Sequence, residues 1–192
     1  GTDLKVITNI RNYDNQNVSN NAFMSGTRIM GVGVVGSGAD ATKSAELDVM
    51  GHEYTHGVVN AKTGNRLLQG ALNGQQSVQF AISERMADIM GEFVEDYSDN
   101  ARMDNSCDWV HGSRSMIRPS GDYLDDAEEF IEGTTDCHYG ITVLSHPAYL
   151  IANGIDGDSS KAIDNETMQK IWYTAIMRFT GSTDFQAVRK IV

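Results

Sequence analysis

The chain has 192 residues, of which 40% are hydrophobic and 21% charged, and its formal net charge is −11 at pH 7. This composition predicts one or two globular domains with a buried core, and no apolar run approaches the roughly 20 residues that cross a bilayer. The negative charge argues against nucleic acid or an anionic membrane surface as partner. Cys107 and Cys137 match neither a disulfide framework nor a Cys-x-x-Cys zinc site, and the sequence leaves open whether they form one bridge or stay reduced.

The first part of the chain predicts short strands separated by polar loops. Residues 3–10 alternate between apolar and polar side chains, residues 12–21 are typical of a loop, and residues 22–30 are expected to be extended again. The glycine-rich residues 30–38 predict a strand and a turn where backbones pass closely. This stretch lacks the Lys-Ser/Thr ending of a phosphate-binding loop, and nothing downstream supports a dinucleotide site.

The first helix is predicted over residues 44–59, where Leu47, Met50, Tyr54 and Val58 recur at helical spacing. Inside it lies a His-Glu-x-x-His pattern. Two histidines four residues apart leave the same face of a helix and can hold one zinc ion, and the glutamate beside the first ligand can take a proton from water at that metal. The pattern also recurs by chance, so the rest of the chain must supply a third ligand.

The second long helix is predicted over residues 77–97, with an apolar stripe that ends at Tyr97. A different stripe carries Glu84, Asp88, Gly91 and Glu95 at spacings of 4, 3 and 4 residues. Such a row is usually a solvated acidic face. A glycine costs about 1 kcal/mol in a helix interior relative to alanine, so we interpret the row as facing a metal, with the glycine admitting a second helix.

The remaining residues predict a long irregular segment over 99–132 and further helices. One helix is expected over residues 140–153, interrupted or restarted at His146-Pro147. Asp164 is the expected N-cap of the next, and Thr183 with Gln186 forms a capping box for the last. The fold class is therefore α+β, a short N-terminal strand region followed by a mainly helical domain.

Several separated segments together resemble the thermolysin-like zinc metalloproteases, in that family's order. They are residues 20–23, residues 47–58, the row Glu84, Asp88, Gly91 and Glu95, then Asp108-Trp109, residues 114–116, His138 and residues 149–151. The resemblance implies a zincin core with the active-site helix between its two parts. Residues 1–60 would be the end of an N-terminal strand-containing subdomain plus that helix, and residues 61–192 a truncated, mainly helical subdomain.

The resemblance also implies roles for individual residues and for Zn²⁺. The zinc ligands would be His52, His56 and Glu84, which leaves a fourth position for water. The catalytic pair would be Glu53 as general base and His138 as donor to the oxyanion. Asp88 would accept the free ring N–H of His52 and fix its tautomer.

Further roles concern the substrate and calcium. By resemblance, Asn21 and the Ala22 carbonyl would align a peptide backbone, Arg114 would bind its carbonyl, and Val49 would line the specificity pocket. The carboxylates that fall where the family holds calcium are Asp48, Glu95 and Asp108, and hard oxygen ligands suit this ion.

More ordinary interpretations stand beside these roles. A lone histidine such as His138 is more often a surface or core residue, and Arg114 could pair with one of many acids. His111 and His146 match nothing in the family pattern, so we treat them as structural or exposed.

The sequence departs from the family pattern in several places. His56 and Glu84 are 28 residues apart, several more than usual in the family, and Gly74 stands where the liganding glutamate often follows Gly-Ala-Leu-Asn. Leu67 replaces a tyrosine that assists oxyanion binding, and loss of such a donor typically costs about 3 kcal/mol of transition-state stabilisation. Ser113 replaces a calcium-binding glutamate, and Asp136 lies closer to the oxyanion histidine than the family's orienting aspartate does.

We expect a secreted zinc endopeptidase that cleaves before bulky apolar residues. The chain opens with glycine, without a signal segment, and ends within a helical pattern, so we expect it to be a processed or recombinant piece of a longer protein. Its expected partners are a peptide or protein substrate and its own propeptide. The alternatives are a catalytically impaired homologue that acts as a binding or structural module, and the fungalysin-type branch of the same superfamily.

Overall fold

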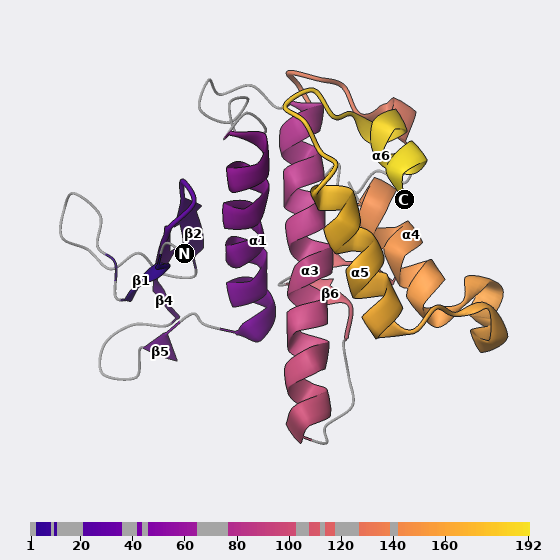
Figure 1. Ribbon diagram of the computed structural model, residues 1–192, viewed down its shortest axis with the longest axis horizontal. Helices are drawn as coiled ribbons and strands as arrows, with labels where there is room; N and C mark the ends of the chain where they lie inside the picture. Colours follow the sequence, from indigo (N-terminus) through magenta and orange to yellow (C-terminus); the bar gives the residue numbers. More distant parts are fainter. Residues whose placement is uncertain are drawn as a thin grey trace.

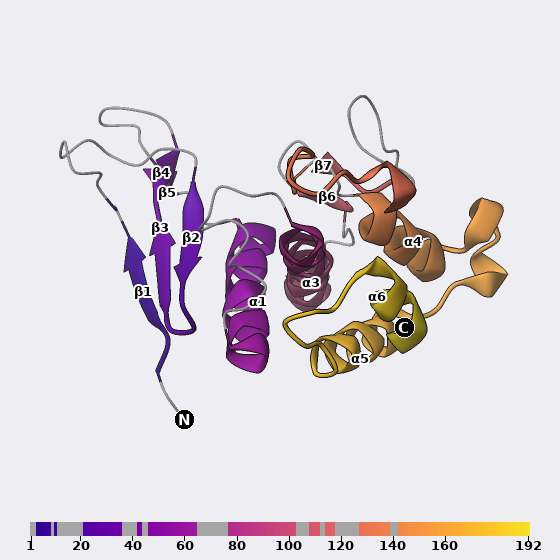
Figure 2. The same cartoon turned by 90° about the horizontal axis from the view of Figure 1, so that it is seen from above.

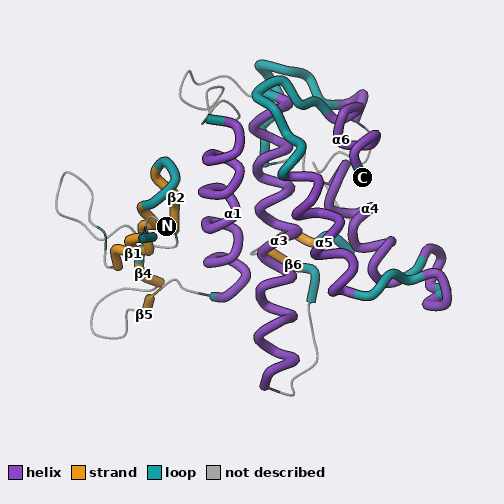
Figure 3. The backbone as a smooth tube through the Cα atoms, viewed as in Figure 1, coloured by secondary structure: helices purple, strands orange, loops and turns teal. Residues whose placement is uncertain are grey.

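The N-terminal residues form a small mixed sheet, and helices follow it (Figures 1 and 3). This order confirms the predicted α+β class. The computed structural model describes residues 3–8, 10, 21–35, 42–43, 46–64, 77–102, 108–111, 114–117, 127–138 and 142–192. Predicted features outside these ranges include Asn20, Leu67, Gly74, Cys107 and Ser113. The division into subdomains at residue 60 stays a prediction.

The sheet has the strand order β1-β3-β2. Strand β3 (Ile29–Val32) lies in the middle, parallel to β1 (Lys5–Thr8) and antiparallel to β2 (Ala22–Ser25). Residues 22–30, expected as one extended segment, thus form a hairpin that turns at Gly26, whose φ of 62° suits glycine. A second pair joins β4 (Val34–Val35) to β5 (Thr42–Lys43).

Two long helices lie side by side next to this sheet. Helix α1 (Leu47–Thr63) lies between the sheet and α3 (Val78–Arg102), as Figures 1 and 2 show from two directions. Helix α1 ends at Gly64, which has a left-handed φ of 67°. The Ser77 hydroxyl accepts a hydrogen bond from Phe80 N–H at the start of α3. The predicted position of the active-site helix between strands and helices is confirmed.

Two glycines allow α1 and α3 to approach closely. A Cβ atom built on Gly91 of α3 would lie 2.5 Å from the Asp48 carbonyl oxygen of α1. A Cβ atom on Gly51 of α1 would lie 3.0 Å from the Gly91 Cα. The predicted interpretation of Gly91, that it admits a second helix, is therefore confirmed.

Replacing Gly91 with alanine is expected to destabilise the protein by about 2 kcal/mol. Forcing the two backbones apart costs up to about 3 kcal/mol, and the better helix propensity of alanine returns about 1 kcal/mol. Gly57→Ala is the matched control, because its Cβ would meet only the flexible end of Met24. Urea unfolding of both variants measures the difference, and equal stability of the two would contradict the close packing.

The rest of the chain packs on the other side of α3 (Figure 2). Strands β6 (Val110–His111) and β7 (Arg114–Ser115) form a short pair, and the other elements are η3 (Ala127–Glu129), α4 (Thr142–Asn153), η4 (Ile155–Gly157), η5 (Ser159–Lys161), α5 (Asn165–Ile176) and α6 (Phe185–Ile191). Their apolar side chains meet those of α3 in one core, which includes Ile82, Phe93, Leu144, Trp172 and Phe179. No described helix is both long and apolar enough to traverse a bilayer.

Details of the later helices differ from expectation. Asp164 caps α5 by accepting from Thr167 N–H, as predicted. The capping box at Thr183 is wrong by one residue, because Asp184 accepts from Ala187 N–H while the Thr183 hydroxyl accepts from Thr180 N–H. The interruption at Pro147 is also wrong. Proline has a helix-compatible φ and removes one hydrogen bond, and α4 continues through it.

Candidate metal centre

Two helices bring three metal-ligating side chains together. His52 and His56 extend from α1, and Glu84 extends from α3, each with less than 8% of its surface exposed. The two Nε2 atoms are 3.0 Å apart, and Glu84 oxygens lie 3.2 Å from His56 Nε2 and 3.5 Å from His52 Nε2. This convergence follows from the helical spacing of the histidines and from the glycine contact between α1 and α3.

These separations fit a zinc ion. Ligands of a tetrahedral ion with bonds of 2.0–2.1 Å are about 3.3 Å apart. The other nitrogen of each ring is occupied by a neighbour on α3: His52 Nδ1 lies 2.7 Å from Asp88 Oδ1, and His56 Nδ1 lies 3.1 Å from Ser83 Oγ. Contacts of this kind fix the tautomer that presents Nε2 to a metal. The donor set is therefore suited to zinc.

Burial and mutual charge shape the electrostatics of this cluster. Burial raises the pKa of Glu84, but His56 and the other histidines outweigh it and lower that pKa to about 2. Burial lowers the pKa of His52 to about 4, against the opposing effect of Asp88. The pKa of His56 is raised, because Glu84 outweighs the burial of the ring. The site thus holds a carboxylate and a neutral His52, both in the form that binds a metal.

Glu53 lies beside this cluster and is 8% exposed. Burial is the main cause that raises the pKa of its carboxyl group, and an opposing contribution comes from the Met24 backbone N–H, which donates to the carboxylate. A carboxylate with a raised pKa is a stronger base, which suits proton transfer near neutral pH. Because Met24 belongs to β2, this contact also joins the glutamate to an edge strand of the sheet.

His138 approaches the cluster from the segment before α4. Its Nε2 lies 3.6 Å from Glu84 Oε2, and its side chain is 50% exposed. Asp136, whose role the sequence left doubtful, lies with Oδ1 2.8 Å from His138 Nδ1 and also accepts from the His138 backbone N–H. The ring is thus oriented with one nitrogen toward the metal cluster.

Asp88→Asn is expected to weaken zinc binding by roughly 10- to 100-fold, the usual effect of losing a partner that orients a metal ligand. The asparagine is neutral, so it attracts the His52 N–H less strongly. Asp88 also pairs with the buried Arg85, so the variant will lose stability as well. Asp96→Asn on the same helix is the control, and competition with a chelating dye measures the zinc affinity. Unchanged affinity together with lower stability would mean that Asp88 serves Arg85 alone.

The structure distributes the other predicted residues around this centre. Asn21 and Ala22 lie at the start of the edge strand β2, where the Asn21 carbonyl accepts from Gly33 N–H. Val49 is half-buried on α1. The backbone of Arg114 pairs with His111 in β7, and its side chain is outside the described part of the chain.

The three expected calcium ligands lie in two neighbouring clusters, in each of which the ligand atoms are within 4.8 Å of one another. One cluster contains Asp48 with Glu92 and His111, and the other contains Glu95 and Asp108 with Glu92. Asp108 is exposed, and its Oδ1 accepts from Val110 N–H at 2.8 Å. Calcium binding by these residues stays a prediction.

Sequence reasoning missed three residues near the centre. Ser83 contacts His56 as described above, and its position next to Glu84 was the only available signal. His111 is 6% exposed and stacks on His52, with ring centroids 4.6 Å apart and an angle of 12° between the planes. Glu92 is fully buried. No local pattern could reveal the last two, because their neighbours come from other elements: β6 packs against α3, and Glu92 lies close to Asp48 of α1 and His111 of β6.

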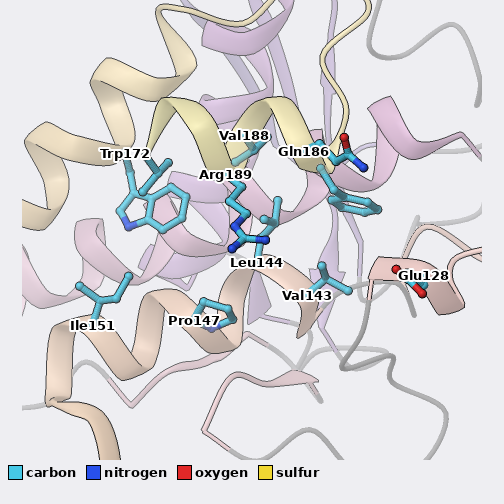
Figure 4. A pocket seen from close by; sticks show the side chains of 11 residues that line it. Glu128, Val143, Leu144, Pro147, Ile151, Trp172, Gln186, Val188 and Arg189 are labelled. Carbon is cyan, nitrogen blue, oxygen red and sulfur yellow. The ribbon is translucent and has the colours of Figure 1, made fainter.

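A separate cavity of about 600 Å³ lies between α4, α5 and α6 (Figure 4). Its described lining is mainly apolar and includes Leu144, Pro147, Trp172 and Val188, with Glu128 and Arg189 as charged members. None of the metal-ligating residues above lines it.

Cys137 is buried and carries no disulfide in the described part, and burial raises the pKa of its thiol.

Comparisons with known proteins agree with this arrangement. The family model described as "Thermolysin metallopeptidase, catalytic domain" matches residues 2–60, and "Thermolysin metallopeptidase, alpha-helical domain" matches residues 75–192. Thermostable neutral protease NprT of Geobacillus stearothermophilus and a thermolysin of Alicyclobacillus acidocaldarius are each 31% identical over 193 residues, which cover 88% of this chain and 32% of the relative. Neutral protease B of Bacillus subtilis is 28% identical over 184 residues, 89% of this chain and 32% of its own length. The chain therefore spans about a third of the length of these curated relatives.

Proposed function

Since the chain belongs to the thermolysin metallopeptidase family, we propose that it forms the catalytic core of a zinc-dependent endopeptidase. The observation that carries this proposal is the convergence of His52, His56 and Glu84 beside the buried Glu53. Both matched family models are thermolysin models, which favours this branch over the fungalysin type. The family and the donor set both support zinc as the cofactor.

Each of the chain's own residues has a task in this reaction. Zinc, when held by the three ligands, supplies a Lewis acid that polarises a carbonyl and acidifies water. Glu53 takes the proton from the attacking water and delivers it to the leaving amine. His138, held at Nδ1 by Asp136, points its Nε2 toward the cluster, and in its imidazolium form this N–H donates to the developing oxyanion. Asp88 and Ser83 keep the two histidine ligands in place.

The edge strand β2 is the proposed place for the substrate backbone. In the described sheet β2 pairs with β3 on one side, and its Met24 N–H reaches Glu53. An extended peptide can add to such an edge by main-chain hydrogen bonds. Asn21 and the Ala22 carbonyl at the start of β2 would align it, and Arg114 would bind its carbonyl by family resemblance.

The finer features of the function rest on family resemblance. We propose cleavage before a bulky apolar residue, with Val49 lining the pocket that receives it. The resemblance and the acidic net charge of −11 support a secreted protein with its own propeptide as a partner. Of the three carboxylates that the resemblance predicts for calcium, Glu95 and Asp108 remain the proposed oxygen ligands, whereas Asp48 lies closer to His111 and Glu92.

The experiment that tests the proposal is hydrolysis of a quenched peptide by the full-length protein. Activity should vanish with a chelator and return with Zn²⁺. Glu53→Gln is the matched inactive variant. If the zinc-loaded protein cleaves no peptide, the alternative of an impaired homologue that binds without cleaving is favoured.

A further inference from the structure

A second cluster of metal-ligating side chains lies on the other side of His52. It consists of Asp48 from α1, Glu92 from α3 and His111 from β6, and their ligand atoms all lie within 4.8 Å of one another. The exposed fractions of the three residues are 4%, 0% and 6%. We propose that this Asp48–Glu92–His111 cluster binds a second divalent transition-metal ion of the zinc class. The proposal does not depend on peptidase activity.

Unsatisfied polar atoms point into this cluster. Asp48 Oδ1 and His111 Nδ1 are buried, and neither makes a hydrogen bond of normal geometry. His111 Nδ1 nevertheless lies 3.0 Å from Asp48 Oδ2. That separation equals the shortest one between donors of the His52–His56–Glu84 cluster, 3.0 Å. Buried carboxylates need a compensating charge and full coordination of their lone pairs, and a cation among these three side chains would supply both.

The imidazole decides the class of metal. Calcium takes six to eight oxygen ligands, and its sites do not use nitrogen. Zinc and its first-row neighbours combine imidazole nitrogen with carboxylate oxygen, in sets as small as three protein ligands. With His111, this cluster offers one imidazole nitrogen beside the carboxylate oxygens of Asp48 and Glu92. The neighbouring oxygen-only group of Glu92, Glu95 and Asp108 is partly exposed and suits calcium better.

The cluster is also in contact with the first metal centre. His111 stacks on His52, and His111 Nε2 lies 3.8 Å from Asp88 Oδ1, the atom that contacts His52 Nδ1. An ion held by Asp48, Glu92 and His111 would therefore fix the plane of the ring that packs against a ligand of the first ion. The two ions share no ligand in this arrangement, so each can be removed separately.

The test is metal stoichiometry after equilibrium dialysis of the full-length protein against Zn²⁺. We expect two zinc ions per chain in the natural protein, one in His111→Leu, one in Glu84→Gln and none in the double variant. His146→Gln should keep two, because His146 lies outside both clusters and contacts the Met116 carbonyl. An anomalous map of zinc-loaded crystals of the natural protein should show a peak between Asp48, Glu92 and His111, and this decides the matter even if a variant fails to fold.

Two results would overturn the proposal. One is a single zinc per natural chain and no anomalous peak at the cluster, which would leave His111 as an ion-pair partner of Asp48. The other is binding of calcium in preference to zinc, lost in Asp108→Asn and retained in His111→Leu, which would assign the ion to the oxygen-only group.

Discussion

Replacing Glu53 with glutamine is expected to lower kcat/KM for a quenched peptide by roughly 10²- to 10⁴-fold, the usual contribution of a general base. Glutamine has nearly the same size, so it fits a position that is 8% exposed. It cannot accept a proton from the attacking water or return one to the leaving amine. The carboxylate that it replaces is a stronger base than usual, because burial raises its pKa. Steady-state hydrolysis by the zinc-loaded protein measures the effect.

The zinc content of the Glu53→Gln variant distinguishes a catalytic role of Glu53 from a structural one. The variant should bind as many zinc ions as the natural protein, because Glu53 is not among the three converging donors. Glu129→Gln is the control, since it makes the same chemical change on an exposed residue of η3. Full activity of Glu53→Gln would remove the base from the mechanism. Loss of both zinc and activity would mean that Glu53 supports the metal site.

The features that sequence predicted correctly depend on local spacing. Glu84, Asp88 and Gly91 lie on one face of α3 because residues three or four apart always share a face of a helix. Glycine in the interior of a helix signals a close neighbour, and α1 is that neighbour. The strand-then-helix order follows from a change in the period of the apolar residues.

The features that sequence could not predict depend on which neighbouring element each face of a helix packs against. Tyr54 and Tyr97 fall at apolar helical spacing, yet their side chains are 54% and 75% exposed. The face of α1 toward α3 instead buries polar residues such as His52 and Thr55, because it carries the metal centre. Apolar periodicity alone assigns such a face to solvent. A functional site therefore buries polar residues on a helix face that apolar periodicity assigns to solvent. A helix whose buried face is polar thus indicates where such a site lies.

His111 shows a second kind of limit. Its position next to His52 and Asp48 arises from the packing of β6 against α3 and from its contacts with α1, and these contacts are remote in sequence. Nothing in residues 108–117 signals that packing. The family resemblance did predict a cation at Asp48, but the other donor atoms near it became visible only in three dimensions.

Replacing Glu84 with glutamine is expected to remove the zinc of the His52–His56–Glu84 centre and with it all peptide hydrolysis. A neutral amide is a poor zinc ligand, and losing a ligand should exceed the roughly 10- to 100-fold loss of affinity seen for orienting partners. The bound ion also stabilises the fold. At zinc concentrations about 1,000 times the Kd, zinc binding adds about 4 kcal/mol to the free energy of unfolding. The variant should lose most of this stabilisation when it is unfolded by urea with zinc present.

Asp96→Asn is the matched control for this prediction, because it makes the same change on α3 and Asp96 belongs to no metal-ligating group in the described chain. Without zinc, Glu84→Gln also loses the carboxylate that raises the pKa of His56. The burial of the ring is then opposed less strongly, so the pKa of His56 should be lower in the zinc-free variant than in the zinc-free natural protein. If Glu84→Gln retains zinc with natural affinity, the third ligand is another residue, and the helix α3 row would be a structural acidic face. Because Glu84 lies within 3.6 Å of three histidine rings, no other described carboxylate is as well placed to replace it.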